Sequence, residues 1–166
     1  MTKEGFSGLK RPLGAIRAIV YGTIVVGTLD ILDAIIFFGS LGIKPIRIFH
    51  SIASGLLGRE AAFSLGLKSA LLGAFLHYFI AFGIVAVYYF VGLRVDALTR
   101  NVLIYGLLYG LVVFGIMSYV VVPLSGAGTG TPHFPLPALL NGLLGHAILI
   151  GLPSAIFAKW GQKGLG

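Results

Sequence analysis

The hydrophobic positions of the chain fall into four long apolar runs separated by short polar segments. The runs cover about residues 14–39, 69–92, 102–123 and 138–158. Each run has the roughly 20 apolar residues that an α-helix needs to cross the hydrocarbon core of a bilayer. The pattern therefore predicts an all-α, polytopic membrane protein with four transmembrane helices, folded as one membrane domain over residues 1–166.

The connection between the first two runs predicts one further, short helix over about residues 45–57. Pro45 suits the first turn of a helix, where its missing N–H is not needed. Polar residues recur at helical spacing and share one face, while apolar residues cover the rest of the surface. The residues of this polar face are Arg47, His50, Ser51 and Ser54. We expect an amphipathic outer helix that lies at the membrane interface or dips into the bundle.

The composition agrees with lipid as the solvent of this chain. Hydrophobic residues make up 57% of it and charged residues only 10%, whereas about a quarter of the residues in a soluble domain are charged. The 25 glycines are typical of membrane helices that pack closely. The chain has no cysteine, which excludes disulfides, thiol catalysis and cysteine-ligated metals.

The formal charge of +7 is distributed unevenly between the two ends of the predicted bundle. The end that carries both termini has eight basic residues: Lys3, Lys10, Arg11, Arg17, Arg94, Arg100, Lys159 and Lys163. The opposite end has four: Lys44, Arg47, Arg59 and Lys68. Because the side richer in Lys and Arg stays in the cytoplasm, we expect a multi-pass protein of a bacterial inner membrane with both termini cytoplasmic. No basic stripe is interleaved with aromatic residues, so the expected partner is the lipid bilayer and not nucleic acid.

Three ionisable residues lie inside the predicted spans at a similar depth. Asp30, His77 and His146 are each eight or nine residues from the outer boundary of their runs, which places them about 12–14 Å below that boundary. Asp33 and Asn141 lie near them on the same helix faces. Ionisable side chains at membrane depth are costly unless paired or ligated, so we expect these five residues to form an intramembrane polar cluster. A glycine one turn from each of the three lets helices approach or leaves room for a bound group.

The cluster leaves several interpretations open. The histidines are hydrogen-bonded fasteners between helices, or they titrate and couple the protein to protons. Alternatively, His77, His146 and Asp30 ligate a divalent metal, or the two histidines hold haem b between the second and fourth spans. A lipid or quinone site is a further alternative. The working hypothesis is a pH-responsive or proton-linked membrane component; the alternative is an accessory or structural subunit of a larger membrane complex.

Two local patterns carry less information. Arg59 and Glu60 are adjacent and are candidate ion-pair partners, and Arg47 or Arg59 is a candidate counter-ion for Asp33. Gly106 and Gly110 form a GxxxG pattern, which indicates helix contact within the bundle more often than dimerisation. The chain has no GxSxG, phosphate-loop or HExxH motif, so no enzymatic activity is expected.

Stretches over nearly the whole chain carry a resemblance to a known group. They are Gly27–Asp30, Arg47–Gly58, Ala74–His77, Gly106–Gly110 with Val122–Ser125, and Asn141–His146. In these stretches the chain resembles a family of small, uncharacterised bacterial inner-membrane proteins with four helices. The last two spans are distantly similar to the YagU-like family, whose link to acid resistance implies proton-linked histidines. Asp30 stands where that group leads us to expect a basic residue.

Overall fold

The structure, a computed structural model, describes residues 7–128 and 134–163, and the side chains of residues 14–128 and 134–162. Every regular element in these residues is helical. Four segments are long and apolar enough to cross a membrane: Gly14–Ser40, Leu67–Gly92, Val102–Leu124 and Leu136–Gln162. The predicted all-α fold with four transmembrane helices is confirmed. The fourth span begins two residues earlier and ends four residues later than predicted.

The first two spans are continuous helices, and the other two change their winding along their length. The elements of the spans are α1 (Ser7–Ser40), α4 (Leu67–Gly92), α6 (Val102–Ile116), η2 (Met117–Val121), α7 (Val122–Leu124), α8 (Leu136–Gly145), η3 (His146–Gly151) and α9 (Leu152–Lys163). The segments η2 and η3 are π-helical, with wider turns than an α-helix. The third span is therefore α6–η2–α7 and the fourth is α8–η3–α9.

A proline explains each π-helical segment. Pro123 and Pro153 each stand two residues beyond the end of the π-helical segment before them. Proline has no N–H to donate, and its ring collides with the carbonyl four residues earlier. The backbone widens just before each proline, so the N–H of Val122 bonds the oxygen of Met117 and that of Leu152 bonds Ala147.

Three short helices connect the spans. The predicted amphipathic helix is α2 (Pro45–Leu57), followed by α3 (Arg59–Ser64), and α5 (Ala97–Arg100) lies between the second and third spans. Gly58 ends α2 with φ of 77°, a left-handed conformation in which its N–H bonds the carbonyl oxygen of Ser54. The sequence pattern predicted α2 but neither α3 nor α5, which are too short to show a period.

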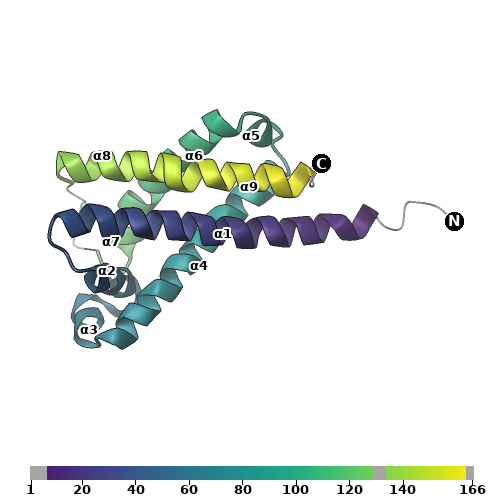
Figure 1. Cartoon of the computed structure of the whole chain (residues 1–166). Helices are drawn as coiled ribbons and strands as arrows, with labels where there is room; N and C mark the ends of the chain where they lie inside the picture. Colours follow the sequence, from purple (N-terminus) through teal and green to yellow (C-terminus); the bar gives the residue numbers. More distant parts are fainter. Residues whose placement is uncertain (1–6, 129–133, 164–166) are drawn as a thin grey trace.

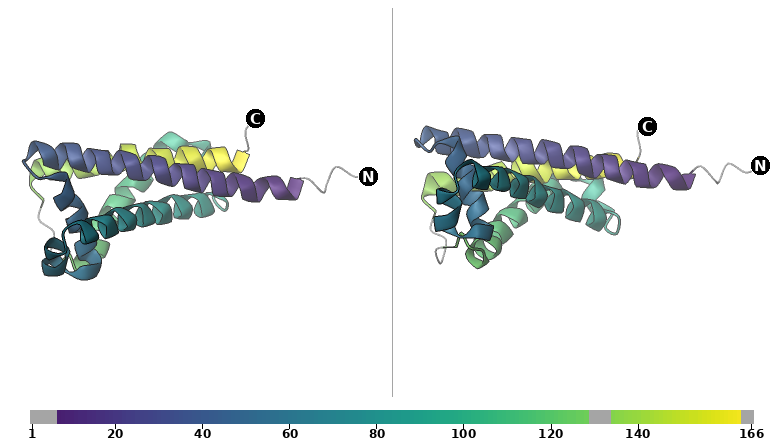
Figure 2. Two further views of the ribbon diagram at one scale, coloured as in Figure 1. Left: turned by 60° about the horizontal axis from the view of Figure 1, so that its bottom comes forward. Right: turned by 90° about the horizontal axis from the view of Figure 1, so that it is seen from below.

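The four spans form an asymmetric bundle (Figures 1 and 2). α1 lies alongside the fourth span for most of its length, and α4 and α6 cross this pair obliquely (Figure 1). α1 packs against α4 as well as against the fourth span, and α6 packs against η3 and α9. We call the end that holds α2 and α3 the α2 end, and the end where α1 begins, α9 ends and α5 lies the terminal end. Of the basic residues predicted at the terminal end, Lys3 lies outside the described residues, as do the side chains of Lys10, Arg11 and Lys163.

A small apolar cluster joins all four spans near the middle of the bundle. It contains Val26 of α1, Ala81 and Val85 of α4, Val113 of α6 and Ile150 of η3. Each of these side chains is at most 5% exposed, so water is excluded from this level of the bundle. A second buried cluster continues toward the terminal end: Ala18, Ile19, Tyr88, Tyr89, Ala155 and Ala158.

Glycines set the distance between the third and fourth spans. A Cβ on Gly110 would overlap the carbonyl oxygen of His146, and a Cβ on Gly151 would overlap the carbonyl oxygen of Gly106. The two backbones are in direct contact there, which only glycine permits. The GxxxG pattern of Gly106 and Gly110 therefore packs helices within the chain.

Replacing Gly110 with alanine tests this backbone contact. Gly110→Ala is expected to destabilise the protein by about 1–3 kcal/mol, because the new methyl group forces the third and fourth spans apart. Gly115→Ala is the matched control, since a Cβ there meets nothing within 4 Å. Unfolding in mixed micelles measures both variants, and equal effects would contradict the proposed contact.

Candidate functional site

Three spans bring ionisable side chains to the same level of the bundle. Asp30 lies ten residues from the α2 end of its span, and His77 and His146 each lie ten residues from the α2 end of theirs. At 1.5 Å per residue this is a depth of about 15 Å, near the middle of a hydrocarbon core roughly 30 Å thick. The three residues therefore share one depth. Asp30 is on α1, and the two histidines are on α4 and the fourth span, which both pack against α1.

His77 is fixed by a hydrogen bond to the backbone of α1. Its Nε2 lies 2.7 Å from the carbonyl oxygen of Gly27, and the contact is buried. A carbonyl oxygen can only accept a hydrogen bond, so Nε2 carries a hydrogen in every protonation state that keeps this contact. The side chain of His77 is only 9% exposed, which leaves the ring little freedom to turn.

The other ring nitrogen of His77 faces a carboxylate. Nδ1 lies 3.9 Å from Oδ2 of Asp30, whose side chain is 31% exposed. When the imidazole is neutral and Nε2 holds the hydrogen, Nδ1 is a lone pair directed at a carboxylate oxygen. Two acceptors then face each other, and a single proton on either group makes the contact attractive.

His146 approaches the same carboxylate from the fourth span. It lies within electrostatic range of both Asp30 and Asp33. Its ring also packs edge-on against Phe114 of α6, with centroids 5.3 Å apart. His146 is the first residue of the π-helical segment η3, and such segments are often found at functional sites. Asp30 thus has His77 of α4 at 3.9 Å and His146 of the fourth span within electrostatic range.

Asp33 ties α1 to the start of the fourth span. Asn141 donates a hydrogen bond from Nδ2 to Oδ2 of Asp33, at 2.9 Å. A Cβ on Gly145 would lie 3.0 Å from the same oxygen, so the absence of a side chain there makes room for the carboxylate. Asp33 lies one turn closer to the α2 end than Asp30. Of the five residues of the predicted cluster, direct contacts pair His77 with Asp30 and Asn141 with Asp33, and His146 lies within electrostatic range of both carboxylates.

The glycines beside the cluster do not leave room for a bound group. A Cβ on Gly27 would collide with the ring of Tyr78, one on Gly142 with the ring of Phe114, and one on Gly73 with the backbone of Phe49. These glycines allow close packing, and neighbouring protein atoms fill the space.

Neither a metal nor haem fits this arrangement. Within residues 7–128 and 134–163, no group of three or more His, Asp or Glu side chains is placed to hold a metal ion. Haem b would need a ring nitrogen of His77, but Nε2 is bound to Gly27 and Nδ1 faces Asp30. The candidate ligands His77, His146 and Asp30 are instead arranged around one another.

The polar face of α2 is only partly exposed. His50 and Ser54 are buried, whereas Arg47 and Ser51 are exposed. Nε2 of His50 bonds the carbonyl oxygen of Gly66 at 3.0 Å, and the hydroxyl of Ser54 donates to the carbonyl of Ser51. This face packs toward α3 and the start of α4, and it does not reach Asp30.

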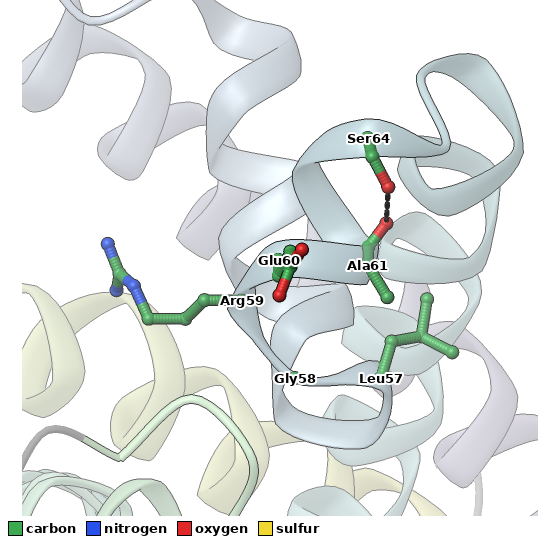
Figure 3. A pocket seen from close by; sticks show the side chains of 6 residues that line it. All are labelled: Leu57, Gly58, Arg59, Glu60, Ala61 and Ser64. Atoms are coloured by element: carbon green, nitrogen blue, oxygen red, sulfur yellow. Dashed lines mark hydrogen bonds between the residues drawn. The ribbon is translucent and has the colours of Figure 1, made fainter.

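The structure does not bring Arg59 and Glu60 together. Neighbouring residues on a helix point in directions about 100° apart, so they rarely pair. Arg59 extends away from the other side chains that line a surface hollow with it, among them Glu60, Ala61 and Ser64 (Figure 3). Within the described residues, no ion pair joins Asp33 to Arg47 or Arg59, and Asn141 is its hydrogen-bond partner.

Two contacts of the cluster were not expected from the sequence. The carbonyl of Gly27 fixes His77, and the hydroxyl groups of Thr28 and Tyr78 lie 3.0 Å apart in the next position of both helices. Gly27 and Thr28 are consecutive on α1, and their partners His77 and Tyr78 are consecutive on α4. The two contacts together fix how α1 is aligned along α4. A backbone acceptor leaves no signal in a sequence.

In comparisons with family models, curated proteins and solved structures, the chain has no significant match.

The positions of Asp33 and Val26 predict that water reaches the cluster from the α2 end. The chain has no cysteine, so single cysteines can be introduced without background. Cysteine in place of Asp33 should react with a membrane-impermeant thiol reagent added on the α2 side, because a thiolate forms only where water is present. Cysteine in place of Val26, which is 1% exposed, should not react from either side.

Exposed positions at the two ends identify the sides in this experiment. Ser51→Cys reports the α2 end and Val95→Cys the terminal end, since both residues are exposed. Reaction of the Val26 variant at the rate of the Asp33 variant would show that the apolar cluster does not exclude water.

Proposed function

We propose that this multi-pass membrane protein responds to protons through the pair formed by Asp30 and His77. The observation that carries the proposal is the distance of 3.9 Å between His77 Nδ1 and Asp30 Oδ2, with Nε2 bound to Gly27. With Nε2 held by a carbonyl, proton uptake by the histidine occurs on the nitrogen that faces the carboxylate. The pair therefore changes charge where α1 meets α4, and the contact between these helices depends on pH.

The surroundings of Asp30 favour a proton-sensing role over transport of protons through the bundle. His146 and Asp33 surround Asp30 from the fourth span and from α1 itself. Toward the terminal end, Val26 and Val85 are each 1% exposed and belong to the cluster that joins all four spans. A proton taken up from the α2 end meets apolar packing beyond Asp30, which supports a sensing role.

We further propose that the protein lies in a bacterial inner membrane with both termini in the cytoplasm. The uneven distribution of Lys and Arg between the two ends supports this orientation. In this orientation the Asp30–His77 pair exchanges protons with the periplasmic side.

Titration of the histidines tests the proposal. The chain has four histidines, so their NMR signals can be followed individually in protein reconstituted in lipid nanodiscs. The signal of His77 is expected to change with pH. Asp30→Asn should alter that change, because the carboxylate that faces Nδ1 is lost.

His50 is the matched control, because its Nε2 also bonds a backbone carbonyl, at 3.0 Å. Its signal at each pH should be the same in wild type and Asp30→Asn. A His77 signal that stays constant from pH 5 to 8, or that ignores Asp30→Asn, would refute the proposed proton site.

A further inference from the structure

The surface of the α2 end carries an excess of positive charge. Between residues 41 and 68 the sequence has four basic side chains and one acidic one, Glu60. The basic residues, all exposed, are Lys44, Arg47, Arg59 and Lys68. Because this end lies where the spans leave the membrane, these charges stand at the depth of the lipid head groups.

Two of these charges are held in place without a counter-ion. The guanidinium carbons of Arg47 and Arg59 lie 5.0 Å and 5.9 Å from the centre of the Phe63 ring. His50 packs edge-on against the same ring, with centroids 5.4 Å apart. Within the described residues, neither arginine forms an ion pair with a carboxylate. Cation–π contacts of this kind orient a guanidinium and leave its N–H groups available to an anion.

An apolar groove lies beside these charges, between α2 and the start of α4. It has a volume of about 280 Å³. Its lining residues are Ile46, Phe49, Leu67, Ala70, Leu71 and Ala74. The two alanines are small and produce the hollow, and Leu67 and Leu71 stand 67% and 64% exposed at its edge. From Leu67 to Ala74 the groove follows α4 for about 10 Å, toward the middle of the membrane.

Two of the basic residues stand next to groove residues in the sequence, one at the start of α2 and one at the start of α4. Arg47 follows the groove residue Ile46, and Lys68 follows the groove residue Leu67. The basic residues therefore mark the end of the groove at the head-group level, and its apolar walls extend into the hydrocarbon. A ligand that fits both parts has an anionic head and an apolar chain.

We propose that the seam between α2 and α4 binds an anionic phospholipid, with its phosphate at Arg47 and Lys68 and one acyl chain in the groove. Charge complementarity selects an anionic head group, and the groove selects a molecule with an acyl chain over a soluble anion. A bound lipid would press α2 against α4 beside Gly73, where the backbone of Phe49 touches α4. The site does not depend on the proton pair of Asp30 and His77.

Native mass spectrometry of the full chain tests the proposal. Protein in mild detergent is mixed with phosphatidylglycerol or phosphatidylcholine of the same acyl composition. The wild type is expected to retain one phosphatidylglycerol molecule and to release phosphatidylcholine. In the double variant Arg47→Gln/Lys68→Gln, retention should fall about 25-fold, because each basic residue near a membrane surface contributes roughly fivefold to binding of an anionic lipid.

Two further variants separate this site from general attraction to basic protein. Arg17→Gln/Arg94→Gln removes the same charge from exposed positions nearer the terminal end and should leave retention unchanged. Ala74→Leu fills the groove, keeps every charge and should reduce retention of phosphatidylglycerol. Equal losses in both double variants, or no loss in Ala74→Leu, would overturn the proposal.

A soluble head group distinguishes a lipid from a free anion. Glycerol 3-phosphate has the anionic head and no acyl chain, so it should not displace phosphatidylglycerol at equal concentration. Displacement by glycerol 3-phosphate, or equal retention of the two lipids by the wild type, would also overturn the proposal.

Discussion

The arrangement of the polar cluster depends on the hydrogen bond between the ring of His77 and the carbonyl oxygen of Gly27. This bond joins α4 to α1 at a depth where an unsatisfied polar group is costly, so the ring of His77 is held in one orientation. That orientation assigns the hydrogen to Nε2 and turns Nδ1 toward Asp30. A backbone contact that satisfies one ring nitrogen therefore leaves the other facing the carboxylate of Asp30.

The close approach of the helices makes this arrangement possible. Where the spans pack most tightly, glycines and small apolar side chains fill the bundle, as at Gly110 against His146 and in the cluster around Val26. Asp30 and Asp33 lie on the α2 side of Val26, and α2 and α3 are added to the bundle at that end (Figure 2). The apolar packing around Val26 therefore closes the bundle on the terminal side of Asp30.

Helix α2 connects the surface of the α2 end with the cluster. Its backbone at Phe49 touches α4 at Gly73, one turn before His77. The basic residues and the groove that we assign to an anionic lipid lie along the same seam. A lipid at the seam and a proton at the pair would therefore act on the same helix, α4. The lipid would contact its first two turns, and the proton would bind at His77 in the next turn.

The sequence by itself determined the four spans, the helix Pro45–Leu57 and the common depth of Asp30, His77 and His146. These features follow from hydrophobic period and helical rise, which are local properties of the chain. Only the tertiary structure decided which atoms meet: that Gly27 accepts from His77, that Asn141 and not an arginine serves Asp33, and that Arg47 and Arg59 share Phe63. These contacts are fixed by the rotation of each helix about its axis and by the angle at which helices cross. Rotation and crossing depend on where glycines let two backbones touch, and such a contact involves two segments that are far apart in the sequence.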